Sequence, residues 1–217
     1  ESYAQMFAFM SLIDPDEAAR ADYAERARTL LMHVMNAAAQ GAADPDDQSY
    51  RCPGDPDTPV YPPFRDPRFF TEDSDRPRWY GEAFALTVDW IYPTLTAEDK
   101  ATINTVFTRW GREIIELAYH HPEPIDVVRD PILLQDRSQV RWSGNNYFAA
   151  HMRNLGMMSM ALDPADSSPE LQGYLANATG AWLYIFDELS RTDAAGGLLP
   201  EGFEYSPQTA SYIIQFL

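Results

Sequence analysis

"DPDEAARADYAERARTLLMHVMNAAAQG", residues 14–41, is the stretch that decides the fold. Its apolar residues recur every three or four positions, which is the spacing of one face of an α-helix. These residues are Tyr23, Ala27, Leu30, Leu31, Val34, Met35 and Ala38. Asp14 or Asp16 stands where an N-cap is expected, and Gly41 follows as a stop signal. The pattern predicts one long amphipathic helix.

The same kind of pattern continues along almost the whole chain. It predicts further helices at 1–13, 78–95, 96–121, 143–162 and 168–191, and a last helix that begins near Ser206. Thr96 and Asp99 have the spacing of a capping box, and Pro207 suits the first position of the last helix. No segment gives a convincing strand signal. We therefore expect an all-α protein of about seven helices in pairs.

The links between these helices alternate in length. Tight links at 93–96 and 163–168 alternate with long ones at 42–77, 121–142 and 192–205. Such alternation predicts an incomplete (α/α) toroid of antiparallel helical hairpins, whose long loops build a site at one end. An irregular bundle and an α-solenoid are the alternatives. The proline-rich segment 42–76 is not helical, and is either a packed loop that lines a cleft or a plain crossover.

Composition limits the class of protein. The chain has 217 residues, of which 45% are hydrophobic and 13% aromatic, as in a globular domain. Its net charge of −17 argues against nonspecific binding of nucleic acid. No apolar run approaches the ~20 residues of a membrane span. The single cysteine, Cys52, excludes an intrachain disulfide and a multi-cysteine metal site.

Both ends of the chain lie in apolar helical patterns without caps. The chain begins with "ESYAQMFAFMSLI" and stops at "TASYIIQFL". Helices normally finish with a stop signal and a loop. We therefore expect residues 1–217 to be a single helical domain that is truncated at both ends.

"RWSGNNYFAAHMRNLG", residues 141–156, carries unusual chemistry for so acidic a chain. No Asp or Glu occurs from Arg137 to Leu162. The stretch is either a positive island that receives an anion, or a buried helix whose arginines pair with acids elsewhere. Asn145 suits an N-cap, whereas the Asn146 carboxamide is able to donate to a substrate carboxylate. Tyr147 and His151 are four residues apart and share a helical face.

"GGLLPEGFEYSPQTASY", residues 196–212, is the second dense stretch. Its glycines at 196, 197 and 202 allow sharp turns. Tyr205 and Tyr212 are seven residues apart and line up if the last helix begins early enough. The alternative is an ordinary helix start, with acids that complement the helix dipole and tyrosines in the core.

Three segments together resemble a known group of enzymes. They are "WYGEAFALTVDWIYPTLTAEDKATI" (79–103), "GNNYFAAHMRNLGMMSMAL" (144–162) and "GLLPEGFEYSPQTASY" (197–212). Their order and spacing resemble heparinase II/III-like and alginate-lyase-like polysaccharide lyases. The resemblance implies an incomplete (α/α) toroid, usually followed by a β-sandwich domain that this chain lacks. It also implies cleavage of uronate-containing polysaccharides by β-elimination, without a cofactor or metal, in a secreted or periplasmic protein.

The resemblance also implies roles for individual residues. By position, Asn146 binds the substrate carboxylate, Tyr205 or Tyr212 serves as base and acid, and His151 assists. The substrate-binding residues that we expect are Arg141, Trp142, Asn145, Tyr147, Arg153 and Glu201. The chain departs from the family where Tyr147 replaces a common His, and where "PEG" at 200–202 replaces a common "DG".

Two other functions fit the same residues. A glycoside hydrolase on a similar toroid needs two carboxylates about 5–10 Å apart, for which Asp89, Glu201 and Glu204 are the candidates. A noncatalytic glycan-binding or scaffold domain uses aromatic side chains to stack on sugars and transfers no proton.

Overall fold

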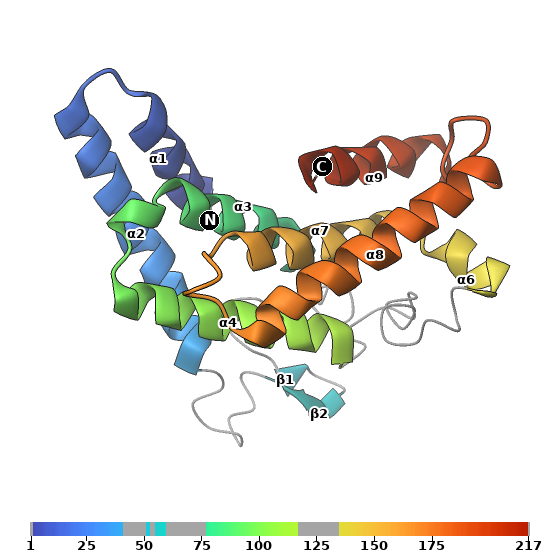
Figure 1. Ribbon diagram of the computed structural model, residues 1–217, viewed down its shortest axis with the longest axis horizontal. Helices are drawn as coiled ribbons and strands as arrows, with labels where there is room; N and C mark the ends of the chain where they lie inside the picture. The colour runs from blue at the N-terminus through green and yellow to red at the C-terminus, as the bar shows by residue number, and fades with distance from the viewer. Residues whose placement is uncertain (1, 41–50, 53–54, 60–76, 117–134, 217) are drawn as a thin grey trace. The chain divides into compact units, whose positions relative to one another are not determined.

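The computed structural model describes residues 2–40, 51–52, 55–59, 77–116 and 135–216 (Figure 1). This part of the chain is almost entirely helical, which confirms the expected all-α class. The contacts divide the chain into two compact units, which are described separately. Unit 1 comprises Glu1–Phe107 and Ala161–Ser168, and unit 2 comprises Thr108–Met160 and Pro169–Leu217.

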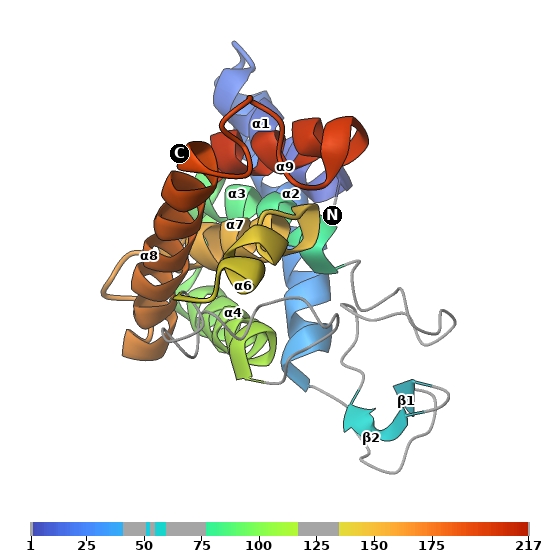
Figure 2. The ribbon, with the colours of Figure 1, turned by 90° about the vertical axis from the view of Figure 1, so that its right-hand side faces the viewer.

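Unit 1 begins with two helices that pack side by side, α1 (Ser2–Ile13) and α2 (Glu17–Gln40) (Figures 1 and 2). The turn between them is closed by aspartates, as the sequence predicts. Asp16 Oδ1 accepts a hydrogen bond from the Ala18 amide at 2.9 Å, which makes Asp16 the N-cap of α2. Asp14 Oδ1 in turn accepts from the Asp16 amide at 2.9 Å.

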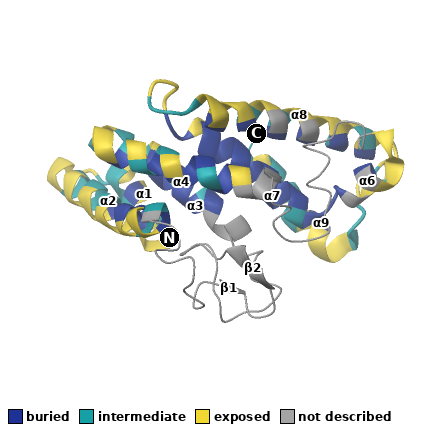
Figure 3. Cartoon of the chain, turned by 90° about the horizontal axis from the view of Figure 1, so that it is seen from below, coloured by how far each residue is buried: buried dark blue, intermediate teal, exposed yellow. Residues whose placement is uncertain are grey.

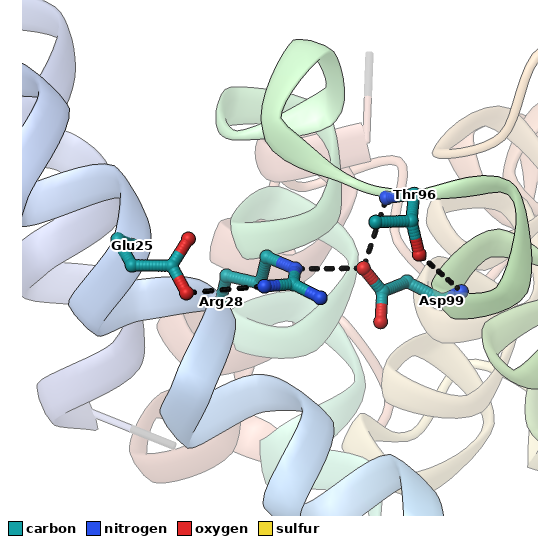
Figure 4. A network of polar contacts seen from close by, with 4 residues as sticks. All are labelled: Glu25, Arg28, Thr96 and Asp99. Atoms are coloured by element: carbon teal, nitrogen blue, oxygen red, sulfur yellow. Dashed lines mark hydrogen bonds and ion pairs between the residues drawn. The ribbon is translucent and has the colours of Figure 1, made fainter.

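The predicted capping box is present at the start of α4 (Ala97–Glu116), which follows α3 (Pro77–Trp90) and the 3₁₀ turn η3 (Tyr92–Thr94). The Thr96 amide donates to Asp99 Oδ2 at 2.9 Å, and the Asp99 amide donates to Thr96 Oγ1 at 3.1 Å. Arg28 of α2 also donates to Asp99 Oδ2, at 2.7 Å (Figure 4). One carboxylate therefore caps α4 and links it to α2.

A second polar cluster in unit 1 joins η3, α4 and the link at 163–168. The Tyr92 hydroxyl donates to Asp166 Oδ2 at 2.5 Å, and Lys100 Nζ donates to the same oxygen at 2.9 Å. The Lys100 ammonium also lies 3.9 Å from the centroid of the Tyr92 ring. Burial raises the pKa of Tyr92, and its bond to Asp166 raises it further. The cluster thus keeps the phenol protonated and holds this link.

A short hairpin lies in the segment that we expected to be irregular. Strands β1 (Arg51–Cys52) and β2 (Asp55–Pro59) pair antiparallel, with Arg51 opposite Pro59 and Cys52 opposite Asp55. Both are edge strands, which is where a sheet tolerates proline. The interpretation of 42–76 as a packed loop lies otherwise outside the described residues.

Unit 2 is built around helix α7 (Asn146–Met160), which packs against both α8 (Pro169–Arg191) and α9 (Gly202–Phe216). Nearly every residue of α7 is buried, as Figure 3 shows. Close packing also requires Gly156, because a Cβ atom there would overlap the Phe216 ring of α9. We expected one helix over 143–162. Its first three residues form a turn instead, preceded by the short helix α6 (Arg137–Trp142).

Helix α9 corrects the prediction for Pro207. The helix begins at Gly202, not near Ser206, so Pro207 lies inside it and not at its first position. Gly202 has a φ of 79°, a left-handed conformation that glycine adopts without strain and that turns the chain into the helix. A proline at this depth removes one backbone bond, the one to the Phe203 carbonyl.

Candidate functional site

Two stretches that the sequence singled out meet in unit 2. The Glu201 carboxylate, from the turn before α9, lies at the start of α7. Its Oε2 accepts from the Asn146 amide at 2.6 Å, and its Oε1 accepts from Asn146 Nδ2 at 2.8 Å. Thr209 Oγ1 of α9 donates to Oε2 at 3.0 Å. Two hydrogen bonds thereby join residues 55 positions apart, and Thr209 adds a third on the same carboxylate.

The local chain explains this geometry. Asn145 is the N-cap of α7, as predicted, because its Oδ1 accepts from the Phe148 amide at 2.8 Å. The next amide, that of Asn146, points out of the helix start, where the helix dipole favours an anion. Gly202 then turns the chain so that the neighbouring Glu201 reaches this position.

The donors are much more buried than the acceptor. Asn146 is 1% exposed and Thr209 is completely buried, whereas Glu201 is half-buried. Where the structure describes the chain, only Nδ2 of the two polar atoms of the Asn146 side chain has a hydrogen-bond partner. Its Oδ1 is buried and has no hydrogen-bond partner among the described residues.

A second pair of predicted residues, Arg153 and Tyr212, also meets in unit 2. The Arg153 guanidinium lies 4.4 Å from the centroid of the Tyr212 ring and donates to Gln215 Oε1 at 2.7 Å. Both Arg153 and Tyr212 are buried. The Tyr212 hydroxyl accepts from Gln208 Nε2 at 2.6 Å. These contacts stabilise the packing of α7 against α9.

The two tyrosines of α9 differ in access to solvent. Both lie in the helix, since α9 begins early enough to include them. Tyr205 is 46% exposed and Tyr212 is 7% exposed. Tyr205 is therefore the one of the two that is open to solvent. On α7, His151 is buried and Tyr147 is half-buried.

The two arginines of α6 lie near an acid from elsewhere in the chain, but they are exposed, whereas the alternative that the sequence left open expected a buried helix. Arg141 Nη1 lies 2.6 Å from Asp193 Oδ1, and Arg137 Nε lies 3.8 Å from Asp193 Oδ2. Arg141 is therefore held by a carboxylate from the turn after α8. The backbone of Trp142 ends α6, and its side chain lies outside the described residues.

The candidate hydrolase carboxylates have different environments. Glu201 accepts hydrogen bonds on both of its oxygens. Asp89 of α3 and Glu204 of α9 are exposed. In the ranges that the structure describes, no group of three His, Cys, Asp or Glu side chains is arranged to hold a metal ion.

Sequence reasoning missed three partners in this site, namely Thr209, Asp193 and Gln215. Asp193 and Gln215 are more than fifty residues from the side chains that they contact, and nothing in their local sequence predicts the pairing. Thr209 lies eight residues from Glu201, on the buried face of α9, the helix that follows Glu201. Its position within a polar stretch was the only available signal.

Comparison with known proteins identified no relative of this chain. No protein-family model, curated protein or solved structure matches this chain. In the described part of the chain, each helix is too short or too polar to cross a membrane.

Proposed function

We propose that this chain is the toroid domain of a polysaccharide lyase that cleaves a uronate-containing glycan by β-elimination. The observation that supports this most is the junction of Asn146 with Glu201. It joins the two sequence stretches of unit 2 that resemble such lyases. A resemblance in separate segments is more meaningful when the segments meet around one polar group.

The proposed chemistry matches the residue types. The proton next to a uronate carboxylate is only weakly acidic, so the enolate-like intermediate needs hydrogen-bond donors. Asn146 supplies a carboxamide at a helix start, where the dipole also favours negative charge. Tyr205 is proposed as the base that removes the proton and as the acid that protonates the leaving oxygen. His151 assists, and Tyr212 supports the site through Arg153.

The proposal extends to architecture and partners. The helical hairpins of the two units are proposed to belong to an incomplete (α/α) toroid, with a C-terminal β-sandwich domain in the full-length protein. The partner is an acidic polysaccharide, and the location is the periplasm or the cell exterior. No cofactor or metal is required by the elimination that we propose.

The first experiment incubates the full-length protein with alginate, heparan-type and pectic polysaccharides. Elimination alone creates a conjugated double bond, which is followed by its ultraviolet absorbance. We expect Tyr205→Phe to lower the rate by about 10²–10⁴-fold, the range of acid–base catalysis. Tyr184→Phe is the matched control, because Tyr184 of α8 is similarly exposed, at 41%. This substitution is expected to leave the rate unchanged.

The other outcomes point to other functions. New reducing ends without absorbance would contradict the lyase and favour a glycoside hydrolase. Glycan binding without either product would favour a noncatalytic domain. An absorbance increase that Tyr205→Phe leaves intact would reject Tyr205 as the base.

A further inference from the structure

The donors around Glu201 form a binding site for a carboxylate. We name the Asn146 backbone N–H, Asn146 Nδ2 and Thr209 Oγ1 the carboxylate receptor. These groups lie 2.6, 2.8 and 3.0 Å from the Glu201 oxygens. Both residues that supply them are almost completely buried. Two donors at the start of α7 and one from within α9 recognise a carboxylate by the helix dipole and by geometry together.

Glu201 satisfies this receptor only in part. Because Asn146 Nδ2 points at Glu201, the orientation of the carboxamide is set and its Oδ1 points away from this carboxylate. That oxygen is buried without a donor among the described residues. Glu201 lies on the Nδ2 side of the carboxamide, so it does not supply the missing donor. A hydroxy acid such as a uronate carries both a carboxylate and hydroxyl donors.

The residue that occupies the receptor lies at the end of a short turn between two glycines of positive φ. Gly197 and Gly202, with φ values of 87° and 79°, lie on either side of Leu198–Glu201, and both have open space where a Cβ atom would be. Residues 195–198 are exposed. Glu201 itself is half-buried, so it has a route to solvent that its donors lack.

We propose that Glu201 is an internal stand-in for the substrate carboxylate. It occupies the carboxylate receptor when no substrate is present, and the carboxylate of an incoming sugar acid replaces it on the same donors. The identification of that acid as a uronate rests on the proposed function. The existence of the receptor rests on the geometry around Glu201 alone.

Competition with an attached carboxylate limits the affinity of small acids. Glu201 belongs to the same chain as its donors, so its binding does not incur the loss of translational and rotational freedom that a separate acid incurs. A single sugar acid therefore binds the wild-type protein weakly, and a polymer gains from its additional contacts. Removal of the Glu201 carboxylate should open the receptor to small carboxylates.

The experiment measures thermal stability of Glu201→Ala in sodium acetate, sodium glucuronate, acetamide and sodium chloride, with ionic strength matched among the salts. At 100 mM, we expect acetate to raise the Tm of this variant by about 2 °C, as for a ligand near half saturation. Glucuronate carries hydroxyl donors as well as a carboxylate, and we expect it to raise the Tm more than acetate does. Wild type and Glu204→Ala, an exposed acid three residues along the chain, should show no carboxylate-specific increase.

Equal changes in the Tm of Glu201→Ala in acetate, acetamide and chloride would contradict the existence of the receptor. The same increase in Tm for Glu204→Ala in acetate would contradict it too. If Glu201→Ala does not fold, Glu201→Gln replaces it, because its neutral amide occupies the receptor less well. This variant should bind a uronate oligosaccharide several-fold more tightly than wild type, and weaker binding would overturn the proposal. These readouts do not depend on elimination. A lyase assay without product, together with acetate-specific stabilisation, would reject the proposed function and leave the receptor intact.

Discussion

Asp99→Ala should be among the most destabilising single substitutions in unit 1. The Asp99 carboxylate accepts from the Thr96 amide at 2.9 Å and from Arg28 at 2.7 Å (Figure 4). A bond of the first kind contributes about 1 kcal/mol, and a bond to a charged partner about 1.5–3 kcal/mol. The side chains of Asp99 and Arg28 are 10% and 28% exposed, so water compensates only partly for the loss. We expect the free energy of unfolding to fall by about 2–4 kcal/mol.

Urea denaturation at pH 7, followed by circular dichroism, measures this loss. With a slope of about 2 kcal/mol per molar urea, the midpoint should fall by about 1–2 M. The control is Asp22→Ala, which removes an ion pair whose two side chains are each 57% exposed. That pair lies in water, so the midpoint should stay within error of wild type. An Asp99→Ala midpoint within error of the control would refute the reasoning.

Three further predictions follow from the same structure. Burial opposes ionisation of Asp99, but hydrogen bonds from Arg28 and Thr96 outweigh it and lower the pKa of Asp99. The ionised carboxylate therefore stabilises the fold fully above its usual pKa of 3.8, and this stabilisation is lost as the pH falls through the folded-state pKa. Acid unfolding of Asp99→Asn should lack this pH-dependent loss. Gly156→Ala should destabilise by about 1–3 kcal/mol through overlap with the Phe216 ring, whereas Gly180→Ala, in open space on α8, should stabilise by up to about 1 kcal/mol; equal denaturation midpoints would contradict both. Thr209→Val should cost about 1 kcal/mol by removing one donor to Glu201, and a melting curve like that of wild type would show that this bond contributes nothing.

Features set by neighbouring residues were predictable from the sequence. The predicted N-caps Asp16, Thr96 and Asn145 agree with the structure. Each of them accepts a hydrogen bond from an amide two or three residues along the chain. The helices themselves agree because their apolar spacing reports the face that each one buries. Such signals lie within one turn of chain and need no knowledge of the packing.

Features set by distant contacts were not predictable. Arg28 binds Asp99 across 71 positions, and no local pattern distinguishes it from an ordinary surface arginine. The start of α9 was predicted too late because Pro207 normally marks a first turn. Here the positive φ of Gly202 begins the helix earlier, and the proline costs only one backbone bond.

The acid-free stretch from Arg137 to Leu162 receives carboxylates from one segment, the turn between α8 and α9. Asp193 near its beginning binds Arg141, and Glu201 at its end binds Asn146. Asn146 is buried, and buried donors are rarely left without acceptors, so an acceptor from elsewhere in the chain is expected beside it. An anion that binds Arg141 or Asn146 therefore competes with this turn. We therefore expect the position of the turn, as well as the charge of α6 and α7, to affect any binding of an anion by unit 2.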